Sequence, residues 1–106
     1  MANIDWKDIE KQTAILAKTI LKGFADQAVA DARDFQKKAQ AHLAEWLTDL
    51  AHGDISQKNF ESLVRGERDL AEMRALKQAG LSKIALDTFT AGFIEIVLHA
   101  ALAALP

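Results

Sequence analysis

The chain has 106 residues, a formal net charge of −2 and no cysteine, and half of its residues are hydrophobic. This length predicts a single domain over residues 1–106. The mild acidity argues against a nucleic-acid partner, and the lack of cysteine excludes disulfides, thiolate metal sites and a cysteine nucleophile. A chain without cysteine, and without the basic and apolar regions of a signal peptide at its start, is typical of the cytoplasm.

The residue usage predicts an all-α fold. Strong helix formers such as alanine, leucine, lysine and glutamate dominate, the one proline is the last residue, and five glycines are scattered singly. With so few turn-forming residues the elements must be few and long. We expect three helices, over about residues 5–51, 55–79 and 82–105.

The first predicted helix carries one continuous apolar stripe, whose spacing alternates between three and four residues as in a coiled coil. Its members are Trp6, Ile9, Leu16, Ile20, Phe24, Ala28, Ala32, Phe35, Ala39, Leu43, Trp46 and Leu50. The stripe passes through Gly23 without being reset, which favours a single helix about 70 Å long that begins near Asp5. The alternative is a break at Lys22-Gly23-Phe24 into two helices, which would favour a monomeric four-helix bundle.

Two short connections separate the remaining helices. His52-Gly53-Asp54 is the clearest stop, with Gly53 suited to a left-handed C′ position and Asp54 to the cap of the next helix, in a capping-box pattern with Gln57. Gly80 ends the second helix and Ser82 caps the third. The connection at residues 80–82 is so short that the last two helices should form a hairpin.

The last predicted helix is apolar on nearly all sides, since Asp87 and Glu95 are its only formal charges after Lys83. Such a helix must be surrounded by other helices or by lipid. About 20 apolar residues would span a bilayer, but Glu95 near the centre and the lack of basic flanks disfavour a span. We therefore expect a bundle helix, with membrane or lipid association through this helix as an alternative.

Two acidic and imidazole pairs are the candidate polar sites. Glu95 and His99, four residues apart amid apolar neighbours, predict a hydrogen-bonded pair at a helix interface or rim. A metal site is the alternative, with His42 and Glu45 of the first helix as a second half-site. The Glu-x-x-His pattern of di-iron bundles is absent, so we expect no metal or cofactor. Because no catalytic constellation is present, we expect no enzymatic activity.

The predicted hairpin covers only half of so long a first helix, so the uncovered half must be buried elsewhere. A second copy in a two-fold homodimer would do this. The expected interface residues are Trp6, Ile9, Leu16, Ile20, Phe24, Phe89 and Phe93. The sequence thus predicts a long N-terminal helix packed against a C-terminal hairpin in a dimeric bundle. It would be a structural or protein-interaction module with an unidentified protein partner; the alternatives are a membrane- or lipid-associated protein and a metal-binding bundle.

Overall fold

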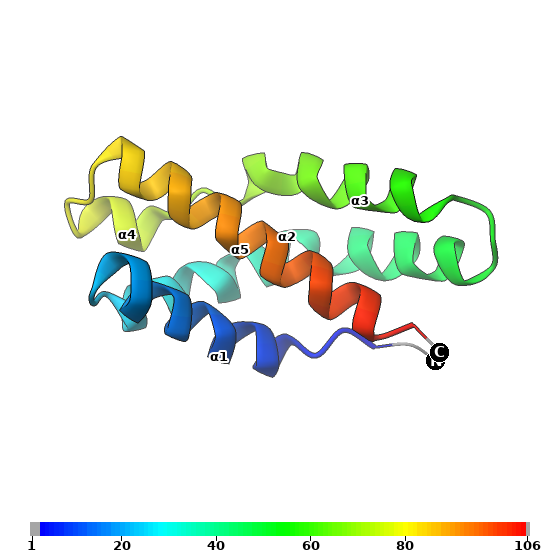
Figure 1. The fold of residues 1–106 in the computed structure, drawn as a ribbon, viewed down its shortest axis with the longest axis horizontal. Helices are drawn as coiled ribbons and strands as arrows, with labels where there is room; N and C mark the ends of the chain where they lie inside the picture. The colour runs from blue at the N-terminus through cyan, green and yellow to red at the C-terminus, as the bar shows by residue number, and fades with distance from the viewer. Residues whose placement is uncertain (1–2, 106) are drawn as a thin grey trace.

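The computed structural model describes residues 3–105, and in that range every regular element is helical (Figure 1). The elements form an elongated bundle with extents of 43 × 22 × 21 Å. In chain order they are α1 (Trp6–Leu16), the π-helical η1 (Ala17–Leu21), α2 (Ala25–Ala51), α3 (Gln57–Gly66), the 3-10 segment η2 (Glu67–Leu70), α4 (Arg74–Gln78) and α5 (Lys83–Ala103). The all-α class is confirmed.

The expected continuous helix over residues 5–51 is wrong, because the chain reverses at residues 22–24. Lys22, Gly23 and Phe24 have φ angles of +56°, +153° and +64°, which no α-helix contains. Before this turn η1 widens to a π-helix, and the N–H of Gly23 reaches back to the Ala17 carbonyl at 3.4 Å. Beyond it α2 runs antiparallel to α1 (Figure 1). The alternative break at Lys22-Gly23-Phe24 is the one that the structure shows.

The continuous stripe favoured one long helix, but a helical hairpin gives the same pattern. Both arms of a hairpin turn their apolar residues toward one core, so the spacing continues across the turn. Ile9 of α1 and Phe35 of α2 are fully buried, and the Trp6 ring lies 6.4 Å from the Phe35 ring between centroids. Three of the five stripe residues that were expected to need a second chain, Trp6, Ile9 and Leu16, therefore pack against the core of one chain, whereas Ile20 and Phe24 stay exposed. The uncovered half of a long first helix therefore no longer argues for a homodimer. The homodimer stays a prediction.

The expected single helix over residues 55–79 is also wrong. α3 tightens into η2 and ends, and the chain turns through Met73, whose φ is +53°, before the short α4. The reason lies on another helix. The Asp31 carboxylate of α2 accepts hydrogen bonds from the backbone N–H of Ala75 at 2.8 Å and of Leu76 at 3.0 Å. A remote carboxylate thus caps α4 and stabilises its separate start.

The N-caps of α3 and α5 show where local sequence signals were sufficient to predict the start of a helix. The Ser82 hydroxyl accepts from the N–H of Ala85 at 3.2 Å, so the predicted cap of the last helix is confirmed. The cap of α3 is Ser56, which accepts from the N–H of Asn59 at 3.1 Å, and not Asp54 as expected. Ser56 competes successfully because its extended backbone leads directly into the first helical turn.

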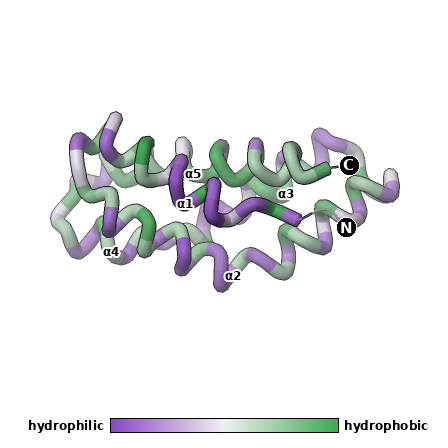
Figure 2. The backbone as a smooth tube through the Cα atoms, turned by 90° about the horizontal axis from the view of Figure 1, so that it is seen from below, coloured by the Kyte–Doolittle hydropathy of each residue, from purple (hydrophilic) through white to green (hydrophobic). Residues whose placement is uncertain are grey.

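The predicted last helix is confirmed as α5, which packs against α1, α2 and α3. Phe89, Phe93 and Val97 are fully buried, and the Phe93 ring meets the Phe35 ring edge-on at 5.2 Å. Among residues 3–105, α5 is the one helix long and apolar enough to cross a membrane, and 39% of its most apolar stretch is buried. In Figure 2 most of its tube has the colours of hydrophobic residues. Part of α5 therefore remains an uncovered apolar surface.

Candidate functional site

Glu95 and His99 do not form the predicted pair. Glu95 is partly exposed and pairs with Arg65 of α3, whose Nη2 and Nε lie 3.0 and 3.2 Å from the two carboxylate oxygens. The hydrogen bonds from Arg65 hold the pKa of Glu95 below its usual value, with a smaller contribution from His99. His99 is exposed. The sequence wheel placed both residues off the solvent face, but it could not show that a guanidinium from α3 takes the carboxylate.

The second half-site expected for a metal also points elsewhere. His42 lies on α2 with its Nδ1 atom 3.5 Å from Oε2 of Glu67, the first residue of η2, and Glu45 is exposed. Within residues 3–105 no three His, Cys, Asp or Glu side chains gather closely enough to hold a metal ion. Two of the four candidates, Glu95 and His42, therefore contact residues outside the predicted pairs, and the four do not gather at one site.

The seven expected interface residues divide into two groups. Ile9, Phe89 and Phe93 are fully buried by the chain's own helices, and Trp6 and Leu16 pack partly buried against that core. In contrast, Ile20 and Phe24 keep 41% and 39% of their surface exposed. Only these last two, beside the turn at residues 22–24, remain available to a partner in this conformation.

Ile84 is the most exposed large apolar residue, at 80%, and sequence reasoning missed it. It lies in the first turn of α5, on the helix side that also carries Thr88 and Glu95. These polar neighbours were the available signal, but apolar residues on nearly every other side of the helix obscured it. The packing between α1 and α5 brings it near η1: a Cβ added to Gly92 would stand 2.9 Å from Leu16, and the two helices are antiparallel (Figure 1). One turn beyond Leu16, the chain must therefore run beside the start of α5, and η1 does contact α5.

We name this end of the bundle the tip. It comprises η1, the turn at residues 22–24, the connection from α4 to α5 and the first turn of α5, and it lies opposite the chain termini (Figure 1). Its apolar members are Ile20, Phe24, Leu81 and Ile84, and its cationic members are Lys18, Lys22 and Lys83. Ile15, also half-exposed, lies on α1 just behind it.

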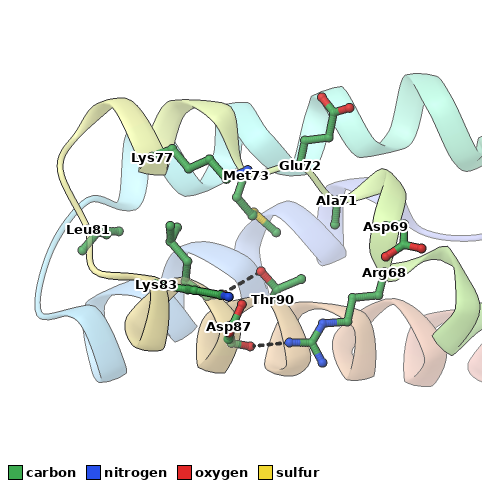
Figure 3. A pocket seen from close by; sticks show the side chains of 11 residues that line it. Arg68, Asp69, Ala71, Glu72, Met73, Lys77, Leu81, Lys83, Asp87 and Thr90 are labelled. Atoms are coloured by element: carbon green, nitrogen blue, oxygen red, sulfur yellow. Dashed lines mark hydrogen bonds between the residues drawn. The ribbon is translucent and has the colours of Figure 1, made fainter.

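A cavity of about 630 Å³ opens beside the tip, between the η2–α4 segment and α5 (Figure 3). Its lining combines three cations with three carboxylates and an apolar floor: Arg68, Lys77, Lys83, Asp69, Glu72, Asp87, Ala71, Met73, Leu81, Leu86 and Thr90. Two of the polar groups are engaged with the backbone, since Arg68 donates to the Asp87 carbonyl at 3.1 Å and the Thr90 hydroxyl donates to the Leu86 carbonyl at 2.7 Å. Serine, cysteine and histidine are missing from the lining, so it offers no Ser–His or Cys–His pair.

Asp31 is the one carboxylate residue buried as a whole within residues 3–105, and its position is structural. Glu67 is only partly buried, although its Oε2 atom is out of contact with solvent. Burial raises its pKa, while the backbone hydrogen bonds from Ala75 and Leu76 act in the opposite direction. Both oxygens accept from the start of α4, and Asp31 is not among the residues that line the cavity. A perturbed carboxylate often marks an active site, but here its hydrogen bonds account for it.

Comparison of the chain with protein-family models, with curated proteins and with solved structures finds no match. The function must therefore be inferred from the geometry of the tip and of the cavity.

Proposed function

We propose that this protein is a non-enzymatic helical-bundle module that works by docking, and that the tip is its docking surface. The supporting observation is the exposure of Ile20, Phe24 and Ile84 on elements that pack against one another. Large apolar side chains gathered on one surface commonly mark an interaction site. The cavity beside the tip adds no Ser–His or Cys–His pair, and the lack of cysteine supports a cytoplasmic setting.

The strained turn at the tip gives further support. Lys22 and Phe24 are not glycine, yet both adopt a left-handed backbone. Each such residue costs roughly 1–3 kcal/mol, and strain of this kind is concentrated at functional sites. Its effect here is to hold a large aromatic ring partly in solvent at the end of the bundle, where a partner can reach it.

Two variants test the proposal. Phe24→Ser and Ile84→Asn remove the exposed apolar surface without opening the core. If docking is the function, these variants should lose whatever association the wild type shows, whether with itself, with lipid or with another protein, while their circular dichroism is unchanged. The homodimer predicted from the sequence is one form of this docking, and sedimentation at micromolar concentration would give twice 11.6 kDa. A wild type that is monomeric, indifferent to lipid and unaffected by these substitutions would contradict the proposal.

Membrane spanning by α5 is the second candidate, because its length and composition suffice. It would require α5 to leave α1, α2 and α3, and thus to expose Ile9 and Phe35 to water. Each large side chain so exposed costs roughly 1.5–3 kcal/mol. Docking by the tip leaves the core intact and is therefore the better-supported function.

A further inference from the structure

The tip combines apolar and cationic side chains on neighbouring segments. Ile20 lies between Lys18 and Lys22 in the sequence, Phe24 follows directly, and Ile84 follows Lys83 at the start of α5. η1 contacts both α2 and α5, so these short runs share one end of the molecule. Lys77, Leu81 and Lys83 line the same cavity mouth and extend this surface toward α4 (Figure 3).

The charge of the tip is opposite to that of the whole protein. The tip as defined holds Lys18, Lys22 and Lys83 and no carboxylate, whereas the chain as a whole carries −2. Asp26 and Asp87 lie just outside it, and Asp69 and Glu72 line the adjoining cavity. None of the ion pairs within residues 3–105 involves any of these three lysines. Their charges are therefore directed at solvent and at whatever approaches the tip.

We propose that the occupant of the tip is the surface of an anionic phospholipid bilayer, an inference that rests on the docking function proposed above. Ile20, Phe24 and Ile84 would enter the boundary between headgroups and acyl chains, and the lysines would lie among lipid phosphates. Long lysine side chains suit this role because their methylene stems tolerate the apolar boundary while the ammonium groups stay at the headgroups. The bundle would stand on the membrane by one end, with its termini directed away from it (Figure 1).

Charge complementarity favours this occupant over a second copy. A two-fold contact between two tips would place the lysines of one chain against the lysines of the other, which repels. The cytoplasmic leaflet, in contrast, has a negative surface potential that attracts each nearby lysine. The attraction corresponds to about a fivefold gain in membrane partitioning per lysine, and it weakens as salt screens it.

The test is flotation of the intact protein with vesicles of phosphatidylcholine alone and of phosphatidylcholine containing phosphatidylglycerol. We expect the wild type to float only with the anionic vesicles and to be released by high salt. The triple variant Lys18→Gln/Lys22→Gln/Lys83→Gln should lose about a hundredfold in partitioning. Its matched control, Lys11→Gln/Lys37→Gln/Lys58→Gln, changes the net charge equally at exposed positions away from the tip and should keep most of the binding.

A second pair of variants measures the contribution of apolar side chains to membrane binding. Ile84→Asn should weaken flotation severalfold, and the control Leu63→Asn, at an exposed leucine of α3, should not. Circular dichroism and thermal melting of each variant show that the fold is retained.

Three results would overturn the inference: no flotation of the wild type, equal flotation with neutral vesicles, or equal losses in the tip and control variants. If the wild type ignores vesicles but self-associates through the tip, the lipid inference fails while the docking function stands. If it neither floats nor associates, both fail.

Discussion

Of the three glycines with positive φ within residues 3–105, Gly23, Gly53 and Gly80, the sequence signalled a turn at the last two but not at the first. At residues 52–54 Gly53 has φ of +78° and directly follows the last turn of α2. At residues 22–24 Gly23 has φ of +153° and lies between two non-glycine residues that are also left-handed. Local chemistry specifies the turn at residues 52–54, whereas packing of α1 against α2 and α5 forces the turn at residues 22–24. The contrast extends to the two other connections: Ser82 caps α5 locally, and Asp31 caps α4 from a distant helix.

The largest expected effect is at the remote cap. Asp31→Ala should lower the free energy of unfolding by about 2–3 kcal/mol, because the N–H groups of Ala75 and Leu76 lose their acceptor at buried or half-buried positions. Ser82→Ala, at a local cap, should cost about 1 kcal/mol. Urea denaturation measures both. A smaller loss of unfolding free energy for Asp31→Ala than for Ser82→Ala would contradict the view that the cap from a distant helix contributes more than the cap from the adjacent residue.

The two glycine turns can be compared directly. Neither Gly23 nor Gly53 has any atom within 4 Å of an added Cβ, so alanine there tests backbone strain alone. We expect Gly23→Ala to cost about 2 kcal/mol and Gly53→Ala about 1 kcal/mol. Gly66→Ala is the control, since it sits in equally open space with an ordinary helical φ of −65° and should stabilise slightly. Equal melting temperatures for Gly23→Ala and Gly53→Ala would show that the two turns do not differ in backbone strain.

Relief of the strain at Lys22 should have the opposite sign. Lys22→Gly removes the cost of a left-handed lysine, offset in part by the greater freedom of glycine in the unfolded chain, for a net stabilisation of about 0.5 kcal/mol. The same change at Lys37, exposed in the middle of α2, should destabilise by about 1 kcal/mol. Chemical denaturation of the pair gives the sign at each site. Destabilisation by both would mean that the turn at residues 22–24 holds no relievable strain.

The smallest effects concern pH, where Asp31 and Glu95 should differ in sign. Burial raises the pKa of Asp31 above 3.8, so its contribution to stability is greatest below pH 3.8 and falls as pH rises through the raised value. The Arg65 hydrogen bonds lower the pKa of Glu95 below 4.5, so its contribution is present above pH 4.5 and is lost as pH falls through the lowered value. Urea titrations of Asp31→Asn and Glu95→Gln between pH 7 and 3, each against the wild type, measure the two slopes. Parallel slopes would show that burial does not distinguish the two carboxylates.

The sequence was sufficient wherever the signal lay within one turn of helix. It predicted the all-α class, the stop at Gly53, the cap at Ser82 and the extent of the last helix. It failed at residues 22–24 because an apolar stripe has the same spacing in one long helix and in a hairpin whose arms share a core. It failed at residues 71–73 because the acceptor that ends one helix and starts the next is Asp31, more than 40 residues earlier in the chain.

The candidate site was less predictable than the fold. Ile20 and Phe24 were named as interface residues, but for the reason that a long helix needed a second chain. Glu95 was matched with His99 on its own helix, since a single helix wheel cannot show the guanidinium of Arg65 on α3. Ile84 was overlooked because a helix apolar on nearly all sides does not reveal which side the bundle leaves uncovered.

The π-helical segment η1 makes this protein tolerant of a change in chain length at one place. A π turn holds one residue more than an α turn. Deleting one residue within Ala17–Leu21 would therefore let this turn close as an α turn while α1 keeps its orientation, with Ile9 still in the core. A deletion in the middle of α2 would instead rotate the residues on one side of it by about 100° and carry core residues such as Phe35 toward solvent. In the loop that joins α2 to α3, one residue more or fewer changes only the path of exposed backbone. Insertions and deletions should therefore accumulate at η1 and in the α2–α3 loop and be purged inside α2.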